Sequence, residues 1–218
     1  MSGSRGKMQG VSETSLRRSY QRLGLLEVDR DVPKLLILKD FLQFYGRTMN
    51  LTARLDDDSI EEHLVEALQV VALARGLHVE GRWLDVGSGG GFPGLVLAAC
   101  LDVDLTLVEP RAKRASVLEL ALGKLRRTNA RVLRGRIEAG KWVGLEGGRL
   151  EGGFAAASAR AVFEPTRWIA EAEPWMAPGG MIVVEIGVGE RIEGDLLGRV
   201  DGERWSAVGV RSVPRGTP

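Results

Sequence analysis

The chain has 218 residues, of which 44% are hydrophobic and 27% are charged, and its formal net charge is +1. This size and balance indicate one globular domain with a small appendage at most, and no apolar run reaches the roughly eighteen residues of a membrane-spanning helix. The N-terminus lacks the apolar core of a signal peptide, and one cysteine with two histidines leaves little for a zinc site, so we expect a cytoplasmic protein without a metal.

The N-terminal part of the chain is predicted to be helical. A basic cluster, Arg17, Arg18 and Arg22, lies in a short first helix. A second helix is expected from Asp31 to about Arg47, because apolar residues recur there at helical spacing. The sequence Ser59-Ile60-Glu61-Glu62 has the pattern of a capping box, so a third helix should begin at Ile60 and end at Gly76.

The segment 82–94 is predicted to form a strand, a tight loop and the start of a helix. An apolar run with an acid near its end meets a burst of glycine, and Pro93 precedes a new apolar stretch. Glycines permit positive φ angles and lack a Cβ, so a ligand can lie directly against the backbone. Open α/β sheets bind ligands at the carboxyl ends of their strands, and we expect this loop to be such a site.

Two glycine patterns overlap in this loop and favour different cofactors. Gly89, Gly91 and Gly94 fit the dinucleotide pattern G-x-G-x-x-G. The residues that fit the first motif of S-adenosylmethionine (AdoMet) methyltransferases are Asp85, Gly87, Gly89 and Gly91. The loop alone therefore allows either AdoMet or NAD.

Two acids bear on this choice. A carboxylate at Asp85 would repel a pyrophosphate, but it suits a ligand that carries a sulfonium and an ammonium group, so it favours AdoMet. Glu109 closes the next apolar run, where an acid can accept hydrogen bonds from both ribose hydroxyls of either cofactor. We therefore predict that AdoMet binds against the loop, with NAD as the alternative.

Strands and helices alternate along the rest of the chain. The expected strands cover residues 105–108, 132–133, 154–158, 181–186 and 205–210, and the expected helices cover about 111–126 and 165–176. Residues 144–153 are predicted to be a loop, and Pro178-Gly179-Gly180 a turn. This alternation indicates a Rossmann-like α/β fold with a doubly wound, mostly parallel sheet. Residues 1–80 would be an N-terminal helical extension packed on the core, and residues 81–218 an AdoMet-binding domain.

The charges are unevenly distributed. Between Arg111 and Arg136 the sequence has nine basic residues and one acid, so this segment carries +8 in a chain of +1. Such asymmetry indicates a polyanionic partner, although a solvated helix face would look the same. We expect Lys124, Arg126 and Arg127 to contact an RNA backbone, with Arg17, Arg18 and Arg22 as further candidates.

Several separated motifs occur in the order in which one known family carries them. They are Asn50-Leu51-Thr52, His63-Leu64-x-Glu66, Asp85-Val86-Gly87-Ser88-Gly89 with Gly91-Phe92-Pro93-Gly94, Lys113-Arg114 and Ser158-x-Arg160-Ala161. Over about residues 30–190 the chain resembles the ribosomal RNA small-subunit methyltransferase G family, also called glucose-inhibited division protein B. Members of that family use AdoMet to methylate N7 of a guanine in the decoding region of bacterial 16S ribosomal RNA.

The resemblance implies roles for five residues. Gly87, Phe92, Ile137 and Glu138 would line the cofactor, and Arg160 would face both the cofactor and the target base as the catalytic residue. Two alternatives stay open at this stage. Glu138 has the character of a surface helix-cap carboxylate, and Arg160 is a candidate ion-pair partner for Glu109 or Asp85.

Other family positions are expected to be structural or to differ. His63 and Glu66 share a helix face and are expected to anchor the N-terminal helices on the sheet. The family usually has a lysine before glycine where this chain has Glu185-Ile186-Gly187, and it has no residue between the serine and the arginine of Ser158-Ala159-Arg160. The chain is also expected to stop, at Pro218, before the last strand of such proteins.

The predicted function is AdoMet-dependent methylation of a guanine N7 in 16S ribosomal RNA, by a monomer that acts on the RNA or on the small ribosomal subunit. Guanine N7 carries a free lone pair and no proton, so the enzyme would contribute orientation and exclusion of water, and no His/Asp catalytic pair is expected. Two interpretations remain as alternatives. One is an NAD(P)-binding oxidoreductase, and the other is a relative that binds AdoMet and RNA without turnover.

Overall fold

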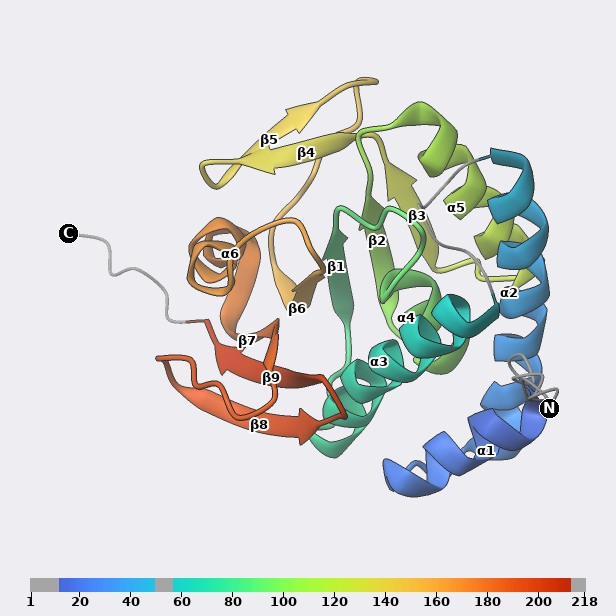
Figure 1. The fold of residues 1–218 in the computed structure, drawn as a ribbon. Helices are drawn as coiled ribbons and strands as arrows, with labels where there is room; N and C mark the ends of the chain where they lie inside the picture. Colours follow the sequence, from blue (N-terminus) through green and yellow to red (C-terminus); the bar gives the residue numbers. More distant parts are fainter. Residues whose placement is uncertain (1–11, 50–56, 213–218) are drawn as a thin grey trace, which may run out of the picture.

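The computed structural model describes residues 12–49 and 57–212, which fold around one central sheet (Figure 1). Its seven strands lie in the order β3-β2-β1-β6-β7-β9-β8. Their bounds are β1 (Arg82–Val86), β2 (Asp104–Val108), β3 (Ala130–Leu133), β6 (Phe154–Ala159), β7 (Met176–Gly187), β8 (Leu196–Asp201) and β9 (Trp205–Arg211). Neighbouring strands pair in parallel, except that β9 is antiparallel to β7 and β8. The doubly wound α/β fold is confirmed.

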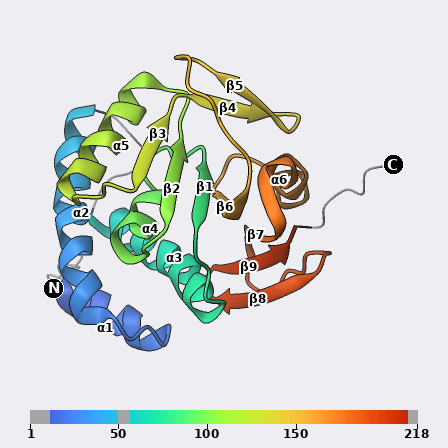
Figure 2. The ribbon, with the colours of Figure 1, turned by 180° about the vertical axis from the view of Figure 1, so that it is seen from behind.

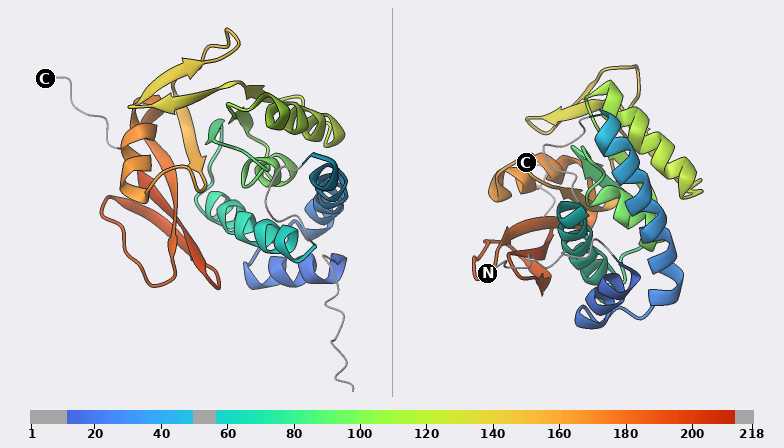
Figure 3. Two further views of the ribbon diagram at one scale, coloured as in Figure 1. Left: turned by 45° about the horizontal axis from the view of Figure 1, so that its top comes forward. Right: turned by 45° about the vertical axis from the view of Figure 1, so that its right-hand side comes forward.

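Helices cover both faces of this sheet (Figures 2 and 3). They are α1 (Glu13–Arg22), α2 (Val28–Met49), α3 (Asp57–Gly76), α4 (Gly94–Cys100), α5 (Ala112–Lys124) and α6 (Pro165–Ala172), which continues into a 3-10 turn at Glu173–Trp175. Helices α1 to α5 share one hydrophobic core with the first face, and α6 packs on the second. No helix in the described part of the chain is both long and apolar enough to cross a membrane.

Alternate residues of each strand fill the two cores. Trp83 and Met181 point into the core shared with α1 to α5, while Leu84, Phe154 and Ile182 point into the core shared with α6. This burial on both sides explains why the strands appear in the sequence as short continuous apolar runs. Helices α1 to α3 belong to the same core as the sheet, as expected of an extension packed on it. The division of the chain at residue 80 stays a prediction.

A buried ionic cluster joins α1, α2 and α3 to the end of α4. Asp31 is fully buried, and its carboxylate accepts hydrogen bonds from Tyr20 Oη at 3.0 Å, Arg30 Nε at 2.8 Å and Arg75 Nη2 at 2.6 Å. Both arginines also donate to the carbonyl oxygen of Cys100, the last residue of α4. Arginine thus satisfies a carbonyl that the helix itself leaves without a partner. Cys100 is buried, as expected.

Three predicted boundaries in the N-terminal half differ from the structure. Helix α3 begins at Asp57, so the capping box at Ser59 is wrong and Ser59 lies inside the helix. Helix α2 begins at Val28 and ends at Met49, longer than predicted at both ends. Helix α4 begins at Gly94, one residue after Pro93. The motif Asn50-Leu51-Thr52 lies outside the described residues.

The C-terminal half contains more strand than the sequence predicted. An unpredicted hairpin, β4 (Gly135–Glu138) and β5 (Lys141–Gly144), turns at Ala139 and Gly140. The turn expected at residues 178–180 lies within β7 instead. Strand β8 was also missed, and β8 and β9 complete the sheet, so the expected loss of the last strand is wrong.

Candidate active site

A cavity of about 740 Å³ opens at the carboxyl ends of the strands. Its wall is built from the segments that follow β1, β2, β3 and β6, together with His63 of α3. Seven of the predicted site residues line it: Gly87, Gly89, Phe92, Glu109, Ile137, Glu138 and Arg160. Asp85 and Gly91 do not lie in the wall. The structure therefore brings these seven residues together although the first, Gly87, and the last, Arg160, are 73 positions apart in the sequence.

The glycines after β1 have two different roles. A Cβ built on Gly87 would lie 2.4 Å from Val162 Cγ2, and one on Gly91 would lie 2.4 Å from Leu95 Cδ1, so both positions are closed by protein packing. Gly89 has a φ of +50°, and a Cβ there would meet nothing closer than 3.5 Å, with Arg114 Nη1 among the nearest atoms. Gly89 is thus where the loop backbone faces open cavity space.

Glu109 ties this loop to the next strand. The carboxylate is 3% exposed; its Oε2 accepts from the backbone N–H of Gly89 and its Oε1 from that of Arg111, both at 2.9 Å. A carboxylate has about four acceptor positions, so these two bonds leave capacity for further donors. The predicted ribose acceptor therefore lies in the wall and also holds the loop in place.

Asp85 lies beneath the loop and not in its surface. It is 1% exposed, its Oδ1 accepts from Ser158 Oγ at 2.7 Å, and Ser158 Oγ in turn accepts from Trp83 Nε1 at 3.0 Å. A Cβ on Gly94 would lie 2.6 Å from Oδ2, so this oxygen faces the start of α4. Burial raises the pKa of Asp85 to about 6, although hydrogen bonds oppose the shift. Ser158, the link in this chain of bonds, was recognised only as part of a motif.

Arg160 is held by acids that the sequence did not pair with it. Its Nη2 donates to Glu66 Oε2 and lies 3.0 Å from His63 Nδ1, and its Nε lies 3.5 Å from Glu185 Oε2. The alternative of a pair with Glu109 or Asp85 is therefore wrong. The anchoring role expected of His63 and Glu66 is confirmed, because through Arg160 they join α3 to the end of β6.

The two acids beside Arg160 differ in their pKa. Burial disfavours the ionised form of Glu66, but hydrogen bonding to His63 and the charge of Arg160 outweigh it and lower the pKa to about 2. Burial dominates at Glu185 and raises its pKa to about 7, while the charge of Arg160 acts in the opposite direction. Glu66 is therefore ionised throughout the physiological range, and Glu185 titrates within it.

Arginines surround the mouth of the cavity. Arg136 pairs with Glu138, and Arg167 pairs with Glu171 and lies over the Phe163 ring. The mouth also includes Arg111 and Arg114, whose side chains make no ion pair among the described residues. The sequence marked Arg111 only as part of the basic segment and Arg114 also as part of the motif Lys113-Arg114, and it contained no signal for Phe163 or Arg167.

The far end of α5 is less suited to RNA than its sequence implied. Arg127 is largely buried, donates to the carbonyl oxygen of Val103 at 3.0 Å and lies 3.6 Å from Asp102. Lys124 and Arg126 are exposed there, but a helix of this length places them about 18 Å from the cavity. The prediction of a phosphate contact is therefore not supported for Arg127.

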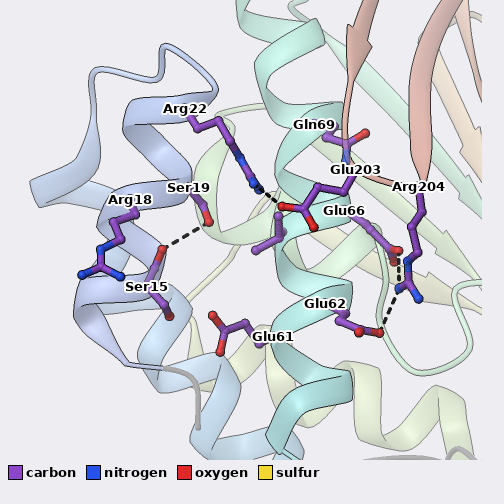
Figure 4. Close-up of a pocket in the computed structure, with 11 residues that line it drawn as sticks. Ser15, Arg18, Ser19, Arg22, Glu61, Glu62, Glu66, Gln69, Glu203 and Arg204 are labelled. Carbon is purple, nitrogen blue, oxygen red and sulfur yellow. Dashed lines mark hydrogen bonds and ion pairs between the residues drawn. The ribbon is translucent and has the colours of Figure 1, made fainter. Parts of the chain in front are cut away.

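A second hollow, of about 560 Å³, lies between α1, α3 and the β8–β9 turn (Figure 4). Its charges face one another: Arg22 pairs with Glu203, and Arg204 pairs with Glu62 and Glu66. Near it, Arg17 pairs with two acids of its own. Because its cations are largely engaged with the protein's own acids, this groove is a weaker candidate for a phosphate site than the cavity.

Comparison with known proteins agrees with this geometry. A family profile described as rRNA small subunit methyltransferase G (GidB) matches residues 31–195, a span that contains every residue of the cavity wall. The chain belongs to this family. Among individual family members, one match spans 57% of the chain and another spans 84%.

Three relatives carry the name "Ribosomal RNA small subunit methyltransferase G". The one from Acidovorax ebreus is 32% identical over 190 residues, 80% of each chain. The one from Sorangium cellulosum is 35% identical over 181 residues, 81% of this chain and 73% of the relative. The one from Neisseria meningitidis serogroup B is 38% identical over 128 residues, and the match spans 57% of this chain and only 59% of the relative's length.

Solved structures share the fold at low sequence identity. A putative methyltransferase, yhhF from Escherichia coli, has a TM-score of 0.52 at 19% identity and covers 69% of this chain and 85% of that one. The structure of MtNAS in complex with MTA and tNA has a TM-score of 0.53 at 15% identity and covers 93% and 76%. At such identities the likeness concerns the fold alone.

Proposed function

We propose that this member of the methyltransferase G family transfers a methyl group from AdoMet to N7 of a guanine in 16S ribosomal RNA, in the cytoplasm, where it meets the small ribosomal subunit. The observation that carries the proposal is that the family match covers the whole wall of the cavity. The cavity lies where open α/β sheets bind their ligands.

The residues present fit AdoMet. Glu109 presents a buried carboxylate for ribose hydroxyls, Phe92 and Ile137 supply apolar surface, and the backbone at Gly89 is open to close approach. Negative charge at Asp85 beneath the loop disfavours the pyrophosphate of NAD, whereas Glu109 suits the ribose of either cofactor. Bound AdoMet would supply an electrophilic methyl group.

The protein's own contribution is then orientation and exclusion of water. A guanine N7 has no proton to remove, so a general base is not required. His63 Nδ1 lies 3.0 Å from Arg160 Nη2 and 3.4 Å from Glu66 Oε2, so this ring nitrogen is engaged with the protein's own groups. Arg111 and Arg114 at the mouth are free to contact phosphates, which dominate the affinity of proteins for nucleic acid.

Transfer of radiolabelled methyl from AdoMet to small subunits that lack the modification tests this proposal. We expect one labelled guanine in 16S ribosomal RNA, and label at no other position. Calorimetry with AdoMet and NADH separates the oxidoreductase alternative, since only AdoMet should bind. Binding of AdoMet without any transfer would favour the inactive relative and contradict the proposal.

A further inference from the structure

The guanidinium of Arg160 uses its nitrogens unequally. Nη2 is bound by Glu66 and His63, and Nε faces Glu185. Nη1 is buried and has no hydrogen-bond partner among the described residues. A buried donor without a partner costs free energy, so such groups in native proteins call for an explanation. Since Arg160 lines the cavity, a ligand there can supply the missing acceptor.

Glu66 is itself fixed from the other side. Its Oε2 binds Arg160, and its Oε1 accepts a hydrogen bond from Arg204 at 3.1 Å across the groove shown in Figure 4. Its side chain is 11% exposed and lines the groove, while its partner Arg160 lines the cavity. Two cations therefore hold one acid in a single orientation.

Glu185 holds Arg160 from the sheet. It lies near the end of β7, its side chain is 18% exposed, and its register partner on β9 is the uncharged Ala207. The charged groups that face it are Arg160, Glu66 and Asp85. Arg160 thus lies between an acid from α3 and an acid from β7, which is an arrangement that restricts its position.

We propose that Glu66 and Glu185 are positioning residues, which hold Arg160 so that its Nη1 is presented to an oxygen of the RNA substrate in the cavity. The inference rests on the proposed function. RNA offers phosphate oxygens and guanine O6, which arginine binds well through its planar fork. A bond to O6 leaves the lone pair of N7 free for methyl transfer.

The arrangement predicts a pH dependence. Above pH 7 Glu185 is ionised and holds Nε of Arg160, and below pH 7 it is increasingly neutral and holds it less well. Glu66 stays ionised across this window, so the change comes mainly from Glu185. Affinity for RNA through Arg160 should therefore fall as the pH drops from 8 to 6.

Binding to small ribosomal subunits that lack the methyl group tests the proposal without AdoMet. Filter binding of the wild type, Glu66→Gln and Glu185→Gln is measured between pH 6 and pH 8. We expect each variant to bind about tenfold more weakly at pH 8, the effect of losing one charged hydrogen bond. Glu185→Gln should also lose the fall in affinity towards pH 6, and AdoMet affinity by calorimetry should change by less than about twofold.

Glu62→Gln is the matched control. Glu62 lies one turn before Glu66 and pairs with the same Arg204, but it has no contact with Arg160 among the described residues. It should retain the affinity and pH profile of the wild type. If Glu66→Gln fails to fold, the comparison of RNA affinity against pH between the wild type and Glu185→Gln still tests the positioning role.

Three results overturn the positioning role. They are variants that match Glu62→Gln, a wild-type profile that is flat between pH 6 and pH 8, or an equal loss of AdoMet affinity, which would assign Nη1 to the cofactor. These results differ from failure of the proposed function, which would appear as a wild type that transfers no methyl group.

Discussion

A buried aspartate from another element lies beside each end of helix α4, Asp31 of α2 at one end and Asp85 of β1 at the other, and the two acids have opposite surroundings. At the C-terminal end, Asp31 is bound by Arg30 and Arg75, which also cap the helix. At the N-terminal end, Asp85 binds the hydroxyl of Ser158, and its Oδ2 has no hydrogen-bond partner among the described residues. At the first end every charge lies opposite another, since Arg75 Nη1 is 2.6 Å from Glu27 Oε2, whereas at the second end Oδ2 of Asp85 lies opposite no cation in the described part of the chain.

This difference distinguishes the end of α4 that stabilises the fold from the end that faces the candidate active site. A buried charge with its partners in place joins helices and is costly to remove. The unsatisfied Oδ2 of Asp85 lies beneath the glycine loop, and the unsatisfied Nη1 of Arg160 belongs to a residue of the cavity wall, so both are placed where a ligand site costs stability. Substitutions at the two ends should therefore affect different properties.

The largest effect is expected at the satisfied end. Asp31→Ala leaves two arginines without their buried acid and should lower the free energy of unfolding by about 3–5 kcal/mol. Chemical denaturation measures this. Asp29→Ala is the control, because Asp29 makes only an exposed pair with Arg17 and should cost less than about 1 kcal/mol. Equal losses in the two variants would contradict the scaffold role of Asp31.

At the other end, the glycine loop should control binding more than folding. Gly89→Val places a side chain where the backbone faces the cavity, and AdoMet affinity should fall at least about 100-fold by calorimetry. The control Gly24→Val has a similar positive φ, +66° against +50°, with nothing within 4 Å. It carries the same backbone strain and should bind normally. Unchanged affinity in Gly89→Val would remove the loop from the site.

Above pH 6, Asp85→Asn should raise the free energy of unfolding, whereas Asp31→Ala should lower it. Because burial raises the pKa of Asp85 from 3.8 to about 6, the folded state holds this proton more tightly than the unfolded state. The wild type therefore loses stability as the pH rises through about 6, by roughly 1–3 kcal/mol, and the asparagine variant avoids this loss. Denaturation at pH 5 and pH 8 measures the difference, and parallel pH profiles for the two proteins would contradict it.

The smallest effect concerns free and distant charges along α5. Arg111→Ala with Arg114→Ala should make the dependence of log RNA affinity on log salt shallower by about 1–2, since each lost phosphate contact removes about 0.7–0.9. Lys124→Ala with Arg126→Ala, at the far end, should leave the slope unchanged. If only the second pair changed the slope, RNA would bind at the end of the helix away from the cavity.

The sequence predicted most of the elements that carry apolar runs. Strands β1, β2 and β6 were recognised because burial on both faces makes them continuous apolar segments. The β4–β5 hairpin was missed because its turn uses Ala139 with a positive φ, where Asn or Gly would be the usual signal. The exposed edge strand β8 lacks an apolar run altogether.

The site was predictable where one segment supplies it, and less so where several segments meet. The glycine loop and Glu109 follow from local pattern, and both line the cavity. The partners of Arg160 come from α3 and β7, more than 20 residues away on either side, so only the fold reveals them. Likewise, Ser59 could not fix the start of α3, because Asp is as good an N-cap residue as Ser and precedes it in the chain.

Mass spectrometry of 16S ribosomal RNA from a strain that lacks this protein tests the proposed methyl transfer in the cell. We expect that one guanine loses its N7 methyl group, that the wild-type protein restores it, and that Gly89→Val does not. A 16S ribosomal RNA with the same modifications in the presence and absence of the protein would contradict the proposed function.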